Sequence, residues 1–440
     1  MGFTNLREQH AVGQGFFHSG ELISDGTRRL RYVYDCGAMA KYACARSDCI
    51  KAYLRSVGAG SKLDLLFISH VHADHLNGLP QLLHAKSGLK VDTIVLPYFN
   101  KIDRLIGYAR EMMENPAAAQ NDFYRSFVLD PTATLSTFDP RQIIFVRPAG
   151  DDSPGAPDLD GIPDGTGPDI TGTGDGEDDL RWKLVGRGTF RGPEKRHVQS
   201  PTINTAVATI PDSMGMAIAD AGTASGYWLF SPFIDPAIER QRGVFKSALF
   251  KALNHGKLRK EQIRKADFDD WLEVPANLQM LVLTKVADLQ EAYTAVEKNL
   301  NLSSMCLYSG PLPDGQRRLR RHHGKFGKWD AQGSAGIAWL ATGDADLKVK
   351  KRRAAFLHHY RNLLDEVVTL TVPHHGSEGN FDPELVTKVE PDFCVAAADA
   401  FGKWRHPGTK VVQAIASEGR FLSVVTSQKA SKVTEQVHIR

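Results

Sequence analysis

The stretch "SHVHADHLNG" (residues 69–78) follows an apolar run and places four metal-binding side chains within six positions: His70, His72, Asp74 and His75. His70 and His72 are two residues apart, so at the end of an extended strand they project to the same side and can share one metal ion. Asp74 and His75 follow around a turn, displaced enough to serve a second ion. The stretch therefore predicts a two-metal centre; the alternative is a polar loop whose histidines cap the next helix.

A centre of this kind is what a two-metal hydrolase needs. One cation polarises the target oxygen, and the pair lowers the pKa of a bridging water so that it can act as a hydroxide nucleophile. We therefore expect an enzyme, a metal-dependent hydrolase with two divalent cations, Zn²⁺ or Mn²⁺. The metals alone do not select between a lactam, a thioester and a phosphodiester.

Apolar, strand-like segments surround residues 69–78, which we call the metal loop. Strands are expected at 30–37 and 63–69, a loop leading into a helix at 74–87, and another buried strand at 91–98. The second half of the chain is expected to add strands at 303–310, 335–344, 367–377 and 391–399. Strands that alternate with helices in this way predict an α/β layered architecture.

The bulk composition describes an ordinary globular protein. Of 440 residues, 42% are hydrophobic and 24% are charged, and 54 basic against 51 acidic residues leave a net charge of +3. The N-terminus lacks the apolar core of a signal peptide, and no apolar run approaches the roughly 18 residues of a membrane span. We expect a cytoplasmic protein with no membrane partner, folded as one domain over residues 1–440. Its five cysteines are then reduced: Cys36, Cys44, Cys49, Cys306 and Cys394.

Residues 151–179 differ from the rest of the chain, since they hold ten acidic residues, seven glycines and four prolines but no Lys or Arg. Such a segment cannot bury enough apolar surface to offset the entropy lost on ordering. Residues 149–180 are therefore predicted to form a flexible acidic loop. Within them, "DLDGIPD" (158–164) faintly resembles a calcium-binding aspartate repeat, but a single copy favours a solvated linker.

Basic residues gather in the second half of the chain. Residues 236–298 are predicted to be a helical basic insertion, and three Lys/Arg runs stand out from a nearly neutral whole. The runs are Lys257, Arg259, Lys260, Arg264 and Lys265; Arg317, Arg318, Arg320 and Arg321; and Lys348, Lys350, Lys351, Arg352 and Arg353. Together they predict a groove for a polyanion, with DNA as the partner. The alternative for each run is an ordinary solvated face.

Several motifs match one known family. The pattern H-x-H-x-D-H after a buried strand resembles the signature of the metallo-β-lactamase superfamily, which implies a four-layer αβ/βα fold within the α/β class. Four flanking motifs resemble, in the same order, those of ComEC-like metallohydrolases: "AVGQGFF" (11–17), "LATGDAD" (340–346), "LTVPHHGS" (370–377) and "RHPGT" (405–409). The chain thus resembles a standalone, soluble member of that branch.

The resemblance implies roles for particular residues. Asp35 matches an early aspartate that supports the metal loop, Asp344 matches the carboxylate that bridges the two metals, and His375 or its neighbour His374 matches the last histidine ligand. The expected metal ligands are therefore His70, His72, Asp74, His75, Asp344 and His375. The expected catalytic residues are Asp74, His374 at the scissile group, and His406 as a phosphate contact or proton donor. The alternative for His406 is a structural role as a helix cap.

Two departures from the family pattern concern the first metal ion. ComEC-like domains often carry Asp where this chain has His72, and no H-x-x-G-H turn precedes Asp344. The ion shared by His70 and His72 therefore lacks an expected third histidine. Candidates for that place are Asn301, Ser303, His197, His255, His322 and His323. Asp346 is expected either to orient a metal ligand or to lie at the surface.

Resemblance and charge together predict a metal-dependent phosphodiesterase, specifically a DNA nuclease in which a metal-bridging hydroxide attacks phosphorus in line. Standalone relatives imply a role in antiphage defence and a regulatory protease as a partner. We hypothesise that the acidic loop occupies the basic groove as a substrate mimic until it is cut. The alternatives are a small-molecule hydrolase, such as a choline-phosphate esterase or a lactamase-like enzyme, and an inactive nucleic-acid-binding protein. The sequence does not predict the oligomeric state.

Overall fold

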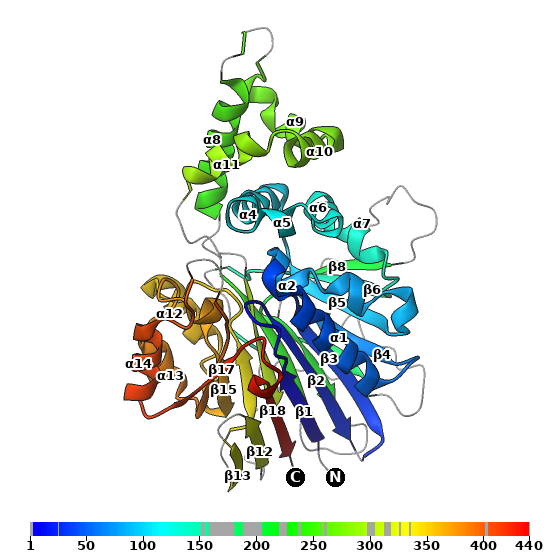
Figure 1. The fold of residues 1–440 in the computed structure, drawn as a ribbon, viewed down its shortest axis with the longest axis vertical. Coiled ribbons are helices and arrows are strands. Elements are labelled where there is room, and N and C mark those ends of the chain that lie inside the picture. The colour runs from blue at the N-terminus through cyan, green and yellow to red at the C-terminus, as the bar shows by residue number, and fades with distance from the viewer. Residues whose placement is uncertain are drawn as a thin grey trace.

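The computed structural model is a mixed α/β protein with two β-sheets, helices against their outer faces, and a helical lobe at the end opposite both termini (Figure 1). It describes residues 3–24, 26–150, 155–157, 180–187, 205–219, 227–235, 239–255, 257–258, 262–296, 304–311, 318–324, 327–333, 336–400 and 404–439.

The larger sheet joins the two ends of the chain. Among the described residues it has ten strands, in the order β13 (Gly327–Gly333), β12 (Arg318–Gly324), β18 (Val433–Ile439), β1 (Phe3–Gln9), β2 (Phe17–Ser24), β3 (Arg28–Cys36), β4 (Lys62–Phe67), β5 (Lys90–Pro97), β6 (Gln142–Arg147) and β8 (Ala206–Pro211). The strands from β13 to β3 pair antiparallel, and those from β3 to β8 pair parallel. The metal loop leaves the carboxyl end of β4, where parallel strands commonly present functional side chains.

The smaller sheet carries three of the four flanking motifs of the sequence. In the described ranges it has eight strands, in the order β17 (Phe421–Val425), β16 (Phe393–Ala397), β15 (Val367–Thr371), β14 (Ala338–Ala341), β11 (Met305–Pro311), β10 (Tyr227–Ile234), β9 (Met214–Ala219) and β7 (Trp182–Gly186). Strands β14 to β17 are parallel, so the loops after β14, β15 and β16 emerge at one edge. Those loops carry the motifs "TGD", "PHHGS" and "RHPGT".

The two sheets pack face to face through apolar and aromatic side chains. Phe67 on β4 meets Phe230 on β10 with ring centroids 5.4 Å apart, and Tyr34 on β3 meets the fully buried Trp339 on β14 at 5.6 Å. Burial of large aromatic side chains is the main stabilising term of such an interface. This packing fixes the loops at the ends of β4 and β14 against one another.

Helices cover the outer faces of both sheets. Those against the larger sheet are α1 (Ala43–Val57), α2 (Ala73–Leu76) and α3 (Leu79–Leu82). Between the end of this sheet and the lobe lie α4 (Lys101–Glu114), α5 (Pro116–Ala119), α6 (Asp122–Leu129) and α7 (Pro131–Ser136) (Figure 1). Those against the smaller sheet are α12 (Lys350–His359), α13 (Glu384–Val389) and α14 (Thr409–Ser417). The lobe beyond α4 consists of α8 (Glu239–Asn254), α9 (Phe268–Glu273), α10 (Pro275–Leu283) and α11 (Val286–Thr294) (Figure 1).

The strands expected from the sequence are confirmed, with ends that differ by a few residues. The helices α4 to α7 were not predicted, although the sequences of α4 and α6 each carry one apolar face. The segment 317–328, read only as a basic run, contributes the edge strands β12 and β13. Of the predicted acidic loop, 151–154 and 158–179 lie outside the described residues. In the described ranges, no helix is long and apolar enough to cross a membrane.

Candidate metal centre

The loop after β4 is held in place by one buried aspartate. The Ser69 backbone N–H and hydroxyl donate to Asp35 Oδ1 and Oδ2, both at 2.6 Å. The same Oδ2 lies 2.7 Å from His75 Nδ1. Asp35 is fully buried and has a positive φ of 57°, a conformation uncommon for a non-glycine residue. Asp35 therefore ties the start and end of the metal loop to β3.

Asp344 reaches the same place from the smaller sheet. Its backbone N–H donates to Ser304 Oγ at 2.9 Å, just before β11. The preceding Gly343 has a φ of +49°, and a Cβ there would collide with Ser304 Oγ and lie 3.0 Å from the Tyr34 hydroxyl. Only glycine allows this close approach of the two sheets. The "TGD" turn thus brings Asp344 opposite the histidines of the metal loop.

The "PHHG" turn after β15 completes the cluster. His374 and His375 both have left-handed backbones, with φ of 48° and 57°. The His374 N–H donates to the Gly343 carbonyl oxygen at 2.9 Å, which joins this turn to the "TGD" turn. Left-handed non-glycine residues are strained and persist where the surrounding structure enforces them, often at functional sites. Here the strain directs two adjacent imidazoles into one buried space.

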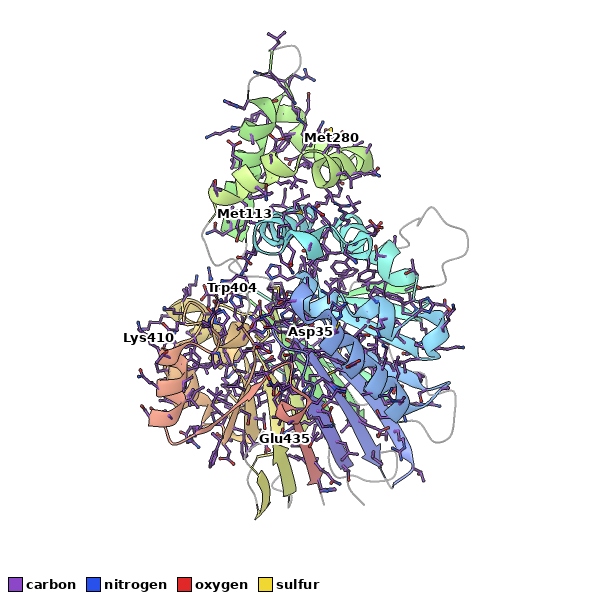
Figure 2. All side chains as sticks on the ribbon, viewed as in Figure 1. Asp35, Met113, Met280, Trp404, Lys410 and Glu435 are labelled. Carbon is purple, nitrogen blue, oxygen red and sulfur yellow. The ribbon has the colours of Figure 1, made fainter. Side chains whose placement is uncertain are left out.

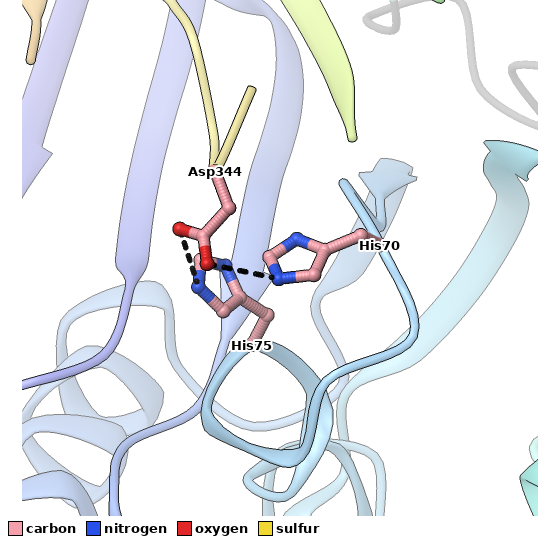
Figure 3. Close-up of side chains that lie close together, drawn as sticks. All are labelled: His70, His75 and Asp344. Atoms are coloured by element: carbon pink, nitrogen blue, oxygen red, sulfur yellow. Dashed lines mark ion pairs between the residues drawn. The ribbon is translucent and has the colours of Figure 1, made fainter. Parts of the chain in front are cut away.

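Asp344 divides the cluster into two sides. Its Oδ2 lies 3.4 Å from His70 Nε2, 3.6 Å from His374 Nε2 and 4.0 Å from His72 Nδ1. Its Oδ1 lies 3.4 Å from His75 Nε2 (Figure 3) and 3.7 Å from His375 Nε2. We call His70, His72 and His374 the first side. The second side is His75, His375 and Asp74, whose Oδ2 lies 3.4 Å from His375 Nε2.

Hydrogen bonds orient four of the imidazoles. His375 Nδ1 lies 2.7 Å from the Ala397 carbonyl oxygen, and His374 Nδ1 lies 2.8 Å from Asn380 Oδ1. An oxygen of this kind only accepts, so both Nδ1 atoms donate and both Nε2 lone pairs face Asp344. The Nδ1 atoms of His75 and His70 are held likewise, by Asp35 and by the Ser69 hydroxyl. Such support at the far nitrogen is usual for metal-ligating histidine.

The cluster fits divalent cations. Within the described residues, the Nε2 atoms of His70, His75 and His375 are buried and have no hydrogen-bond partner. Leaving a buried polar atom unpaired costs about 1–3 kcal/mol, so three that converge on one space indicate a missing ligand. Ligands bonded to a tetrahedral zinc ion lie about 3.4 Å from one another, close to the distances around Asp344. Three overlapping groups of potential ligands are present: His70, His75 and Asp344; His70, His72 and Asp74; and Asp74, His75 and His375.

The imidazoles of the first side are held in the neutral form that binds metal. Burial lowers the pKa of His70, and it lowers the pKa of His72 well below its usual value. Burial also lowers the pKa of His374 to about 4, although the Asp344 carboxylate opposes this. Because a metal-ligating imidazole must be unprotonated, these three rings need lose no proton at pH 7.

The second side is more negative. Burial disfavours the charged form of His75. Three nearby carboxylates, those of Asp74, Asp35 and Asp344, outweigh burial and raise the pKa of this imidazole well above its usual value. Burial likewise disfavours the charged form of Asp74, but His75 and His375 outweigh it and lower the pKa of the carboxyl group. A dication on this side therefore displaces a proton from His75 and meets carboxylates that are already ionised.

The "RHPGT" loop lies against the first side. The Gly408 N–H donates to the Gly376 carbonyl oxygen at 2.9 Å, which joins the loop to the "PHHG" turn. The His406 ring centroid lies 6.0 Å from that of His374, and Trp404 stacks on His406 at 6.3 Å. Burial and the charge of His375 lower the pKa of His406 to about 4. A neutral His406 at pH 7 suits a hydrogen-bonding contact to phosphate better than proton donation.

The structure thus gathers every residue expected at the site: His70, His72, Asp74, His75, Asp344, His374 and His375, with His406 beside them. His374 lies on the first side, with its Nε2 3.6 Å from Asp344 Oδ2, whereas the sequence suggested other candidates for a third ligand there. Of those, His322 and His323 lie on β12, at the end of the molecule that carries the termini (Figure 1), and His255 follows α8 in the helical lobe. Ser304 and Asn380 were missed, since single polar residues carry no recognisable sequence signal.

Two other expectations change. Asp346 does not orient a ligand, because its Oδ2 pairs with Arg352 Nη1 at 2.6 Å and the side chain is buried. Arg353 is also buried and pairs with Glu384 at 2.6 Å. Two of the five cations in the run 348–353 therefore stabilise α12 instead of lining a groove. The side chains of 318–321 lie outside the described residues.

The geometry and the comparisons together suggest a hydrolase of the metal-dependent class. No protein-family model matches the chain. Over 80 residues, 18% of its length, the chain is 29% identical to ComE operon protein 3 of Bacillus subtilis, of which this covers 10%. Over 71 residues, 16% of its length, it is 35% identical to Ribonuclease Z of Listeria welshimeri, of which this covers 20%. The matches thus span a fifth or less of either relative.

Proposed function

We propose that the chain is a metallo-β-lactamase-type phosphodiesterase with the four-layer αβ/βα fold of that superfamily, and that its substrate is DNA. The observation that carries this proposal is the buried arrangement of two imidazole-rich sides around the single carboxylate of Asp344. A centre that holds two cations about one bridging carboxylate suits hydrolysis of a phosphodiester. The short matches to ComE operon protein 3 and to Ribonuclease Z support the same class.

Each part of the cluster then has a role. Asp344 and the two sides would hold two divalent cations, which supply Lewis-acid stabilisation of the phosphoryl group and activate water. Asp35, Asn380 and the Ala397 carbonyl keep the imidazoles aimed at this space. His406 donates a hydrogen bond to a phosphate oxygen from the rim of the first side.

Nucleic acid as the substrate is supported by the rim of the site. Trp404 is half-buried and stacks on His406. In the view of Figure 2 it lies below Met113 of α4 and above Asp35. An aromatic side chain in this position can stack on an unpaired base whatever its sequence. Lys350 and Lys351 are exposed at the start of α12, after the "TGD" turn, where they can attract a polyanion.

The proposal extends to antiphage defence, to a regulatory protease, and to an acidic segment that restrains the site. These parts rest on the resemblance of the motifs and on the composition of residues 151–179. Deletion of 151–179 tests the restraint: the variant should cleave DNA faster than the full chain, with a steeper dependence on salt, because salt no longer also releases a competing acidic segment. Equal rates and equal salt dependence would contradict it.

A direct test incubates the protein with plasmid DNA, single-stranded DNA, RNA and a small phosphodiester under Mn²⁺, Mg²⁺ or Zn²⁺. Cleavage of DNA by the wild-type chain, lost in Asp74→Asn and kept in Asp269→Asn, is the expected result. Asp269 is a matched control, because its carboxylate is largely exposed on α9, away from the cluster. Hydrolysis of the small diester without cleavage of any nucleic acid would favour a small-molecule hydrolase. Preference for RNA would assign the chain a substrate like that named for Ribonuclease Z.

A further inference from the structure

Helix α4 lies directly on the metal loop. A Cβ at Gly107 would lie 2.7 Å from the Val71 side chain, so the helix approaches the loop as closely as glycine permits. One turn later, Glu111 Oε2 accepts a hydrogen bond from the Ala73 N–H at 3.3 Å. The face of α4 between these two contacts therefore looks onto the segment that carries His70, His72 and Asp74.

Arg110 lies between those contacts and is buried, with 5% of its surface exposed. Its Nε donates to Glu114 Oε2 at 3.0 Å, one turn along the same helix. Its charge acts on the first side of the centre: besides burial, it lowers the pKa of His72, and it also lowers that of His374. The Asp344 carboxylate in turn contributes to a raised pKa of Arg110, against the effect of burial.

The helical lobe also holds α4 in place. Arg242 on α8 makes two hydrogen bonds to Asp103 on α4, Nε to Oδ1 and Nη2 to Oδ2, both at 2.8 Å. The Tyr108 hydroxyl donates to the Val282 carbonyl oxygen on α10 at 2.9 Å. The face of α4 that carries Arg110 is thus clamped between the lobe and the metal loop, which fixes where Arg110 points.

We propose that Arg110 binds the non-bridging oxygens of the scissile phosphate on the first side, and that the helical lobe serves to hold Arg110 there. The assignment rests on the proposed phosphodiesterase function. A guanidinium group is permanently charged and presents planar donors that match phosphate oxygens. In a buried site, such a fixed cation stabilises the charge that develops on the phosphoryl group.

The test uses the full chain loaded with Mn²⁺ and bis(4-nitrophenyl) phosphate as the substrate. Arg110→Gln should lower kcat by about 10²-fold, the usual cost of removing one preorganised donor to a developing oxyanion. Arg110→Lys keeps the positive charge but not the planar set of N–H donors, so it should recover part of the lost kcat. Arg264→Gln is the matched control, because it removes the same charge from an exposed position that pairs only with Asp267 among the described residues, and it should behave as wild type.

A second readout does not depend on turnover. Inorganic phosphate should raise the Tm of the Mn²⁺-loaded wild-type protein and of Arg264→Gln, but raise that of Arg110→Gln far less. Unchanged kcat and an unchanged phosphate shift in Arg110→Gln would overturn the assignment, as would loss of bound Mn²⁺ in both Arg110 variants. If the wild-type protein bound Mn²⁺ but hydrolysed neither the diester nor DNA, the proposed function would fail instead, and the phosphate shift would still report on Arg110.

Discussion

The two sides of the candidate centre use the same ligand chemistry but stand in different electrostatic surroundings. The first side has three neutral imidazoles and the cation Arg110 nearby. Asp344 is its nearest carboxylate, and Asp74 also lies within 4.8 Å of His70 and His72. The second side includes Asp74, and Asp35 pairs with the far nitrogen of His75. These carboxylates raise the pKa of the His75 imidazole, so a metal ion would have to displace its proton. Equivalent geometry therefore does not imply equivalent affinity.

The difference suggests a division of labour. A dication is stabilised most where carboxylates are most numerous, so the second side should hold its metal more tightly. The first side, less negative and bordered by His374, His406 and Arg110, should hold its metal more weakly and meet the phosphate. The four predictions below test this comparison in order of decreasing effect.

Asp344→Ala should weaken metal binding on both sides, since this carboxylate contacts both. Loss of a bridging carboxylate removes several kcal/mol of transition-state stabilisation, which corresponds to about 10³-fold or more in kcat. Bound Mn²⁺ or Zn²⁺, measured by elemental analysis after gel filtration, should fall on both sides. The variant Asp346→Asn is the control, because that carboxylate pairs with Arg352 instead of facing the cluster. A variant that kept two equivalents of metal would contradict the bridging role.

Asp35→Asn should weaken the second side most, because Asp35 contacts His75 directly and reaches His70 on the first side only through the Ser69 hydroxyl. The amide cannot accept from Ser69 N–H, Ser69 Oγ and His75 Nδ1 as the carboxylate does, so His75 loses its orientation. Removal of an outer partner of a metal ligand typically costs 10–100-fold in metal affinity, and we expect about 100-fold here. Isothermal titration with Zn²⁺ should show a large loss of affinity at one site and a smaller loss at the other. Weakening of both sites by the same factor would argue against two separable sides.

Asn380→Ala should weaken the first side, by a smaller factor. It removes one neutral hydrogen bond, from His374 Nδ1 to Asn380 Oδ1, and leaves the ring in place between neighbouring turns. We expect about a tenfold loss at the weaker of the two Zn²⁺ sites and little change at the tighter one. The same titration measures this, and an effect confined to the tighter site would reverse our assignment of the two sides.

Lowering the pH should weaken the second side before the first. The pKa of His75 is raised, so metal binding there releases about one proton and the affinity falls by up to about tenfold per pH unit below that pKa. The first-side rings have lowered pKa values, that of His374 about 4, so their affinity should stay nearly constant down to about pH 5. Titrations in buffers of different ionisation enthalpy count the protons released at each site. Equal proton release on both sides would refute the electrostatic difference.

Much of the fold was predictable, because the buried strands are short apolar runs followed by polar turns. The runs that became β3, β4, β5, β11, β14, β15 and β16 are all of this kind. The strand β12 escaped prediction because its Arg-rich sequence resembles a solvated surface, and strand pairing supplies the order that propensity does not. The helices α4 and α6 are amphipathic and were open to prediction from their apolar periodicity, although no helix was expected there.

The ligand residues themselves were determined by the sequence, because a cluster such as His70-x-His72-x-Asp74-His75 places its donors by local strand and turn geometry alone. Only the tertiary structure decided which side each distant residue joins. His374 and His375 are neighbours in the chain, yet their left-handed backbones turn them to opposite oxygens of Asp344. Arg110 carries no motif at all, and it reaches the centre only because α4 is clamped between the helical lobe and the metal loop. Contacts between residues far apart in the chain depend on packing, and packing is a property of the whole fold.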